Sequence, residues 1–104
     1  MAVIRVQGRR LAVAGRVGYD EAGRFSAACR KFLTGPGRAG GSIDLGGAEE
    51  LVSPCLAALY DGARLHRPEG LSLVVPERLA HLFAPAEIEG LFTVTVARRA
   101  AGRT

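Results

Sequence analysis

Residues 42–56 constrain the fold more than any other stretch, because a buried-strand pattern runs there into the start of a helix. Alternating apolar residues stop at the pair Gly46-Gly47, which is expected to end the strand. Ser53 is a residue type that caps helix N-termini, and Pro54 suits the first helical position, where its missing N–H costs nothing. The stretch predicts a strand, a short loop and a helix whose N-terminus directs backbone donors toward the loop, where functional groups often gather.

The rest of the chain repeats this alternation of strand and helix patterns. Strands are expected at residues 2–7, 11–15, 42–45, 71–75 and 91–96. A first helix is expected after residues 18–21 and should run to about residue 33, and two more helices should span residues 54–66 and 76–83. The apolar stripe predicted for the first helix consists of Ala22, Phe25, Ala28, Cys29, Phe32 and Leu33. The first two strands should form an antiparallel hairpin, and the glycine-rich segment 34–41 should be a flexible surface loop without phosphate-binding spacing. The order β-β-α-β-α-β-α-β predicts a single α/β domain, with helices packed against a small, mixed, mostly parallel β-sheet.

The composition is that of one ordinary globular domain. Its 104 residues are enough for a single core, and no apolar run approaches the roughly 20 residues of a membrane span. The start of the chain has no signal-peptide pattern, so a cytoplasmic location without membrane insertion is expected. The formal net charge of +4 comes with arginine clusters, but no aromatic platform or helix-turn-helix pattern accompanies them. Nucleic-acid binding is therefore not expected, and residues 98–104 are interpreted as a basic tail after a domain at 1–97.

Nothing in the sequence supplies the parts of an enzyme active site. Cys29 and Cys55 lack the spacing of a redox or metal-binding pair and are expected to be buried free thiols. His66 and His81 lie on separate segments without neighbouring ligands, so no metal or other cofactor is expected. The adjacent carboxylates at positions 49–50 should point apart and belong to a solvated turn. Because no nucleophile is placed beside a base, catalysis is not expected.

Residues 44–56 resemble, without a gap, the signature of STAS domains, the fold of anti-sigma-factor antagonists. That signature is Asp-Leu, a short variable loop, an apolar residue, and then Asp-Ser-Ser-Gly-Leu at the start of the second helix. Here Val52 replaces the aspartate, Ser53 keeps the first serine, Pro54 replaces the second serine and Cys55 replaces the glycine. In the antagonists the second serine accepts phosphate, so the resemblance implies the fold without the usual phosphoswitch.

The resemblance covers about residues 2–96 and implies a non-catalytic protein-interaction module. Its expected partner is an anti-sigma factor, which in this family is a histidine-kinase-like ATPase. The alternative is a STAS subunit of a lipid-transport ABC system that contacts the ABC transporter ATPase, and nucleotide or lipid-anion binding at the helix N-terminus also stays open. The residues expected to contact the partner are Glu49, Glu50, Val52, Ser53, Pro54 and Cys55. Ser53 is interpreted as a helix cap, with phosphorylation as the alternative.

Overall fold

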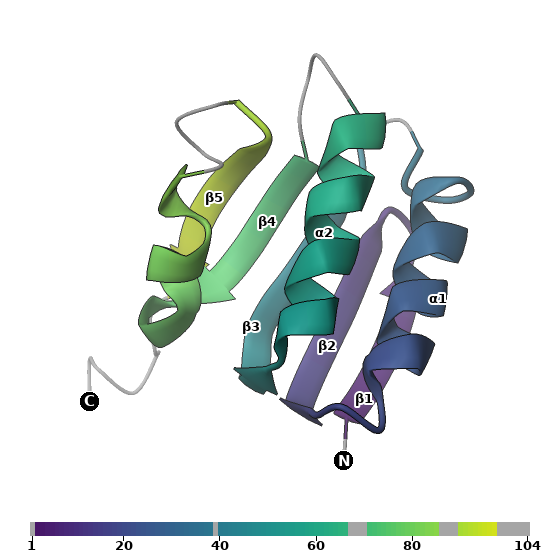
Figure 1. Ribbon diagram of the computed structural model, residues 1–104. Helices are drawn as coiled ribbons and strands as arrows, with labels where there is room; N and C mark the ends of the chain where they lie inside the picture. The colour runs from purple at the N-terminus through teal and green to yellow at the C-terminus, as the bar shows by residue number, and fades with distance from the viewer. Residues whose placement is uncertain (1, 39, 67–70, 86–89, 98–104) are drawn as a thin grey trace.

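The computed structural model describes residues 2–38, 40–66, 71–85 and 90–97 (Figure 1). Its elements are β1 (Ala2–Gln7), β2 (Arg10–Val17), α1 (Ala22–Leu33), β3 (Ser42–Leu51), α2 (Ser53–Leu65), β4 (Leu71–Pro76), the 3-10 helix η1 (Glu77–Leu82) and β5 (Phe92–Ala97). This alternation of strands and helices confirms the predicted α/β fold. The basic tail predicted at 98–104 lies outside the described residues.

The strands form one mixed sheet of five strands in the order β1-β2-β3-β4-β5. β1 pairs antiparallel with β2, as the predicted hairpin requires, and the other three pairings are parallel. Figure 1 shows α1, α2 and η1 on the same face of this sheet. Parallel strands need crossover connections, and α1, α2 and η1 lie within the connections between the parallel strands.

The third helix differs from the prediction. Residues 76–83 were expected to form an α-helix, but Pro76 is the last residue of β4 and only Glu77–Leu82 are helical, with 3-10 winding. Pro76 keeps an extended backbone (φ −71°, ψ 152°), which delays the start of the helix. A segment this short commonly adopts the tighter 3-10 form. Phe83, directly after it, is fully buried and attaches the segment to the core.

The core lies between the two α-helices and the sheet. The buried residues of α1 and α2 are Ala22, Phe25, Cys29, Phe32, Leu33, Cys55, Leu59, Gly62 and Ala63. Five of the six residues of the apolar stripe predicted for α1 are thus buried, and the sixth, Ala28, is half-buried. Within the described part of the chain, no helix is long and apolar enough to cross a membrane.

α2 runs without a break through Asp61-Gly62, where the sequence pattern is interrupted. A β-carbon at position 62 would lie 2.5 Å from Cδ1 of Leu33 on α1. The missing side chain of Gly62 therefore lets the two helices approach closely, and packing offsets the weak helix propensity of glycine.

The two buried thiols should make the protein less stable at high pH. Both cysteines are free and buried, as predicted. Burial raises the pKa of Cys29 from 9.0 to about 12, and the neighbouring Cys55 adds a smaller effect in the same direction. The thiol ionises near its ordinary pKa in the unfolded chain but stays protonated in the fold, so stability should fall as the pH rises from about 9 toward 12.

Urea denaturation at a series of pH values measures this effect. Between about pH 9 and pH 11, the wild-type protein should lose roughly 1 kcal/mol more per pH unit than Cys29→Ala does. Comparing slopes cancels the ionisation of tyrosine and lysine, which both proteins share. Equal slopes for the two proteins would contradict the assignment.

Candidate functional site

β3 is longer than predicted and contains residues that were expected in a loop. It runs through Gly46-Gly47 and pairs with β2 as far as Leu51, opposite Val17, so the prediction that the glycines end the strand is wrong. The register shifts twice along this pairing, and each shift inserts one extra β3 residue, as in a β-bulge. The Asp44 carboxylate accepts a hydrogen bond from the Gly46 N–H at 2.8 Å. The glycine pair therefore lies at an irregularity within a continuing strand.

A cavity of about 460 Å³ lies where β3 separates from β4. Their pairing ends at Asp44 and Val74, although β4 continues to Pro76. The cavity is lined by residues 46–49, Pro76, Glu77, Arg78 and Ala97. The Arg78 guanidinium donates a hydrogen bond to the Ala48 carbonyl and so connects η1 to β3. The cavity lies at the carboxyl ends of β3, β4 and β5, the side of an α/β sheet where ligands and partners commonly bind.

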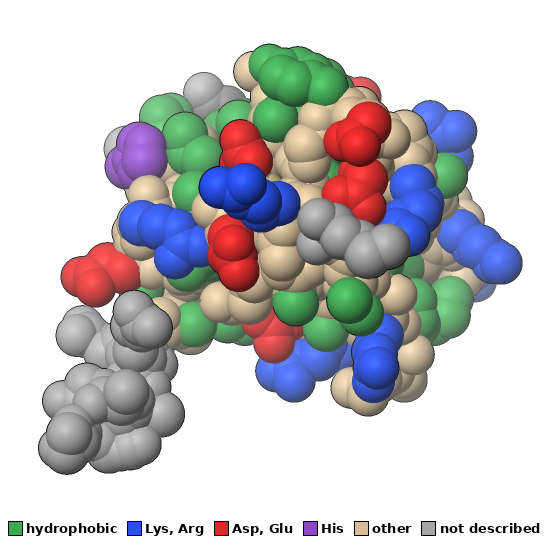
Figure 2. All heavy atoms as spheres, turned by 90° about the horizontal axis from the view of Figure 1, so that it is seen from below, with side chains coloured by type: hydrophobic (Ala, Val, Ile, Leu, Met, Phe, Trp, Pro, Cys, Tyr) green, Lys and Arg blue, Asp and Glu red, His purple; other side chains and the backbone are tan. Residues whose placement is uncertain are grey.

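The adjacent side chains of Glu49 and Glu50 line different recesses of the surface. Glu49 lines this cavity, whereas Glu50 lines a separate recess with Arg16 and Asp20. They point apart, as expected, and do not form one paired-acid site. Figure 2, which views this end of the molecule, shows acidic side chains gathered among basic ones. Asp20 and Glu77 were not predicted for this site, although each follows the carboxyl end of a strand, and that position could have identified them.

The start of α2 also differs from the prediction, because Val52 occupies the N-cap position and Ser53 is already helical. Val52 is still extended (φ −83°, ψ 164°), and its N–H bonds to the Val17 carbonyl of β2 at 3.4 Å. Its own carbonyl accepts the Cys55 N–H at 2.9 Å, which begins the helix. No side chain of a described residue caps the helix, so the interpretation of Ser53 as a cap is wrong, and Pro54 is the second helical residue instead of the first.

The predicted contact residues divide into outward-facing and inward-facing groups. Those exposed at the surface are Glu49, Glu50, Ser53 and Pro54, which we call the helix-entry surface. Val52 is half-buried against the core, and Cys55 is fully buried and cannot contact a partner. The Ser53 hydroxyl makes no hydrogen bond with any described residue. It is therefore available at the surface, in the first turn of a helix.

Among the described residues, no group of three or more His, Cys, Asp or Glu side chains could hold a metal ion. Both histidines stand apart from the site, His66 at the end of α2 and His81 on η1. The geometry thus offers an exposed surface with charged side chains beside a helix N-terminus. The chain matches no protein-family model, and a search of curated proteins also found no match.

Proposed function

We propose that this chain is a non-catalytic protein-interaction module that resembles an anti-sigma-factor antagonist and binds its partner through the helix-entry surface. The partner is a histidine-kinase-like ATPase that acts as an anti-sigma factor. The observation that carries this proposal is the exposed, unbonded hydroxyl of Ser53 in the first turn of α2, next to the exposed ring of Pro54. In the family that the sequence resembles, the same place in the chain contacts the kinase.

Binding by this surface would not depend on the usual phosphoswitch. Pro54 stands where the antagonists carry the phosphate-accepting serine, and it has no hydroxyl. Val52 stands in place of their aspartate and turns partly into the core. The remaining hydroxyl, on Ser53, occupies the position of the serine that is not the acceptor. The proposed complex is therefore regulated by the amount of each protein, or by a signal other than serine phosphorylation.

The second candidate is a STAS subunit of a lipid-transport ABC system that contacts the transporter ATPase. The free hydroxyl of Ser53 is compatible with this role too, since such a contact needs no phosphorylation. Anion binding at the start of α2 is less favoured by the charges, because the exposed carboxylates of Glu49 and Glu50 precede this helix closely. Both candidates use the helix-entry surface and differ only in the ATPase that binds it.

Ser53→Asp should weaken partner binding about tenfold or more, because a new carboxylate would have to be desolvated within a close interface. The fold should tolerate the change, since an acid in the first turn of a helix interacts favourably with the helix dipole. The matched control is Ser72→Asp, which places the same exposed charge on β4, away from this surface. The measurement is titration calorimetry with the ATPase recovered from native lysate by affinity capture of the tagged protein.

The capture experiment itself separates the candidates, with partners and modification sites both determined by mass spectrometry. A histidine-kinase-like ATPase recovered with unmodified Ser53 supports the first candidate, and an ABC ATPase supports the second. Phosphate on Ser53 would contradict a phosphorylation-independent complex. Equal affinities of wild type and Ser53→Asp would show that the helix-entry surface is not the interface.

A further inference from the structure

β1 is an edge strand, and part of its backbone faces outward without a partner. It pairs with β2 around the two-residue turn formed by Gly8 and Arg9. In an antiparallel pair, successive residues alternate between bonding to the neighbouring strand and facing away from it. The backbone N–H and C=O of Ala2 point away from β2 and bond to side chains of the α1 region. Because the direction alternates along the strand, the backbone groups of Ile4 and Val6 point away from β2 as well. Among the described residues, none bonds the outward backbone groups of these two residues.

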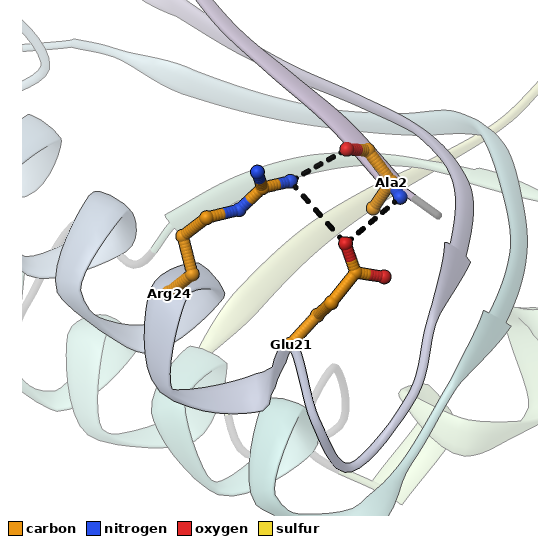
Figure 3. A network of polar contacts seen from close by, with 3 residues as sticks. All are labelled: Ala2, Glu21 and Arg24. Atoms are coloured by element: carbon orange, nitrogen blue, oxygen red, sulfur yellow. Dashed lines mark hydrogen bonds and ion pairs between the residues drawn. The ribbon is translucent and has the colours of Figure 1, made fainter.

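The start of this edge is closed by the polar network in Figure 3. The Glu21 carboxylate accepts the Ala2 N–H at 3.1 Å, and the Arg24 guanidinium donates to the Ala2 carbonyl at 2.5 Å. Glu21 and Arg24 also form an ion pair at 3.6 Å. These bonds occupy the groups that an added strand would need at Ala2. The available edge therefore begins after Ala2 and includes Ile4 and Val6.

A groove of about 430 Å³ runs beside this open edge, between β1 and α1. Its apolar lining is Ile4, Val6, Ala28, Phe32 and Pro36, and its charged lining is Arg24 and Lys31. Val6 is 49% exposed, a large fraction for a valine beside a core. Lys31 is exposed and makes no ion pair within the described part of the chain. Among the described residues, no acidic side chain lines the groove, and because Arg24 is already paired with Glu21, Lys31 is the cation of the lining that lacks an ion pair.

The geometry points to a second interaction site, at which the open edge of β1 binds an extended partner segment as an added strand. Backbone bonds to Ile4 and Val6 would hold such a segment, and its alternate side chains would enter the groove beside α1. The apolar lining requires apolar side chains at those positions, and the cation of Lys31 favours a carboxylate beside them. The occupant is therefore an extended peptide that combines apolar and acidic residues. A second copy of this basic chain, with net charge +4, would bring no excess of acids to the groove.

The test uses the full-length, ¹⁵N-labelled protein and a short acetylated peptide of alternating valine and glutamate. Binding should slow amide hydrogen exchange at Ile4 and Val6 about tenfold or more. Exchange at Val3 and Arg5 should change little, since their N–H groups already face β2. Lys31→Glu should weaken peptide binding about fivefold or more. Its matched control is Arg30→Glu, an exposed cation in the same turn of α1 that does not line the groove, and it should bind like wild type.

A further variant, Val6→Pro, removes one outward N–H at a position where an edge strand tolerates proline, and it should abolish peptide binding. If this variant does not fold, the comparison of Lys31→Glu with Arg30→Glu still decides the question. Equal binding of a peptide with lysine in place of glutamate would overturn the acidic specificity. Peptide-free protection of Ile4 and Val6 that grows with protein concentration would assign the edge to a second copy instead. Peptide-induced shifts confined to the helix-entry surface would overturn the site.

Discussion

Replacing Phe83 with alanine is expected to lower the free energy of unfolding by about 3–5 kcal/mol, because the ring is fully buried. Its ring and that of Phe92 on β5 pack in a T-shaped pair with centroids 5.4 Å apart, and Phe92 forms a second T-shaped pair with Tyr60 of α2 at 5.2 Å. The Tyr60 hydroxyl donates to the Leu82 carbonyl at 3.1 Å. These contacts connect η1, β5 and α2, so the loss would be large beside the roughly 5–15 kcal/mol of total stability of such a domain.

Urea denaturation followed by circular dichroism measures the effect. Leu65→Ala is the control, because Leu65 is 71% exposed and its loss should change stability by less than about 0.5 kcal/mol. The Phe83 variant should also loosen η1, and with it the Arg78 bond to the Ala48 carbonyl beside the cavity. A Phe83→Ala protein as stable as Leu65→Ala would show that the aromatic group does not hold η1 in place.

Gly41→Ala is expected to destabilise the fold by about 2–3 kcal/mol through overpacking. A β-carbon at this position would lie 2.8 Å from the carbonyl oxygen of Gly37 and even closer to its Cα. Both groups are backbone, so no flexible side chain can move aside. Gly37 is itself buried against the ring of Phe32, and its N–H bonds to the Phe32 carbonyl at 2.8 Å. The backbone near Gly41 therefore has little room to shift.

Gly23→Ala provides the matched control, since it is the same chemical change in an exposed part of α1. No atom of the described part of the chain lies within 4 Å of a β-carbon at that position, and alanine is the better helix former. This variant should gain about 0.5–1 kcal/mol, so the two substitutions should shift the urea midpoint in opposite directions. A stabilised Gly41→Ala protein would contradict the packing described for this loop.

The packing of the glycine-rich loop is a feature that the sequence alone did not predict. Segment 34–41 was expected to be a flexible surface connection because it is rich in glycine, and glycine commonly signals a turn. The structure instead buries Gly37 and Gly41 against each other and against the end of α1. The composition of a loop indicates that helices and strands stop there. It does not indicate whether the backbone of the loop is itself packed.

The sequence predicted only part of the arrangement of the residues near the site. Glu49 and Glu50 point apart, as adjacent residues should, and both are exposed. Cys55 is buried because it lies on the stripe of α2 that packs in the core. Ser53 has a free hydroxyl because Val52 takes the N-cap position, which a preference for serine at caps could not reveal.

The sequence by itself determined the α/β class, the hairpin at the start, the apolar stripe of α1 and the burial of both cysteines. These features depend on periodicity and turn residues, which are local properties of the chain. Only the tertiary structure decided that β3 continues through Gly46-Gly47 to Leu51, since backbone pairing with β2 holds those residues extended. It likewise decided that the side chains of Glu21 and Arg24 bond the backbone of Ala2, while the edge of β1 after Ala2 stays open. Contacts between residues far apart in sequence set both outcomes, and no local pattern encodes them.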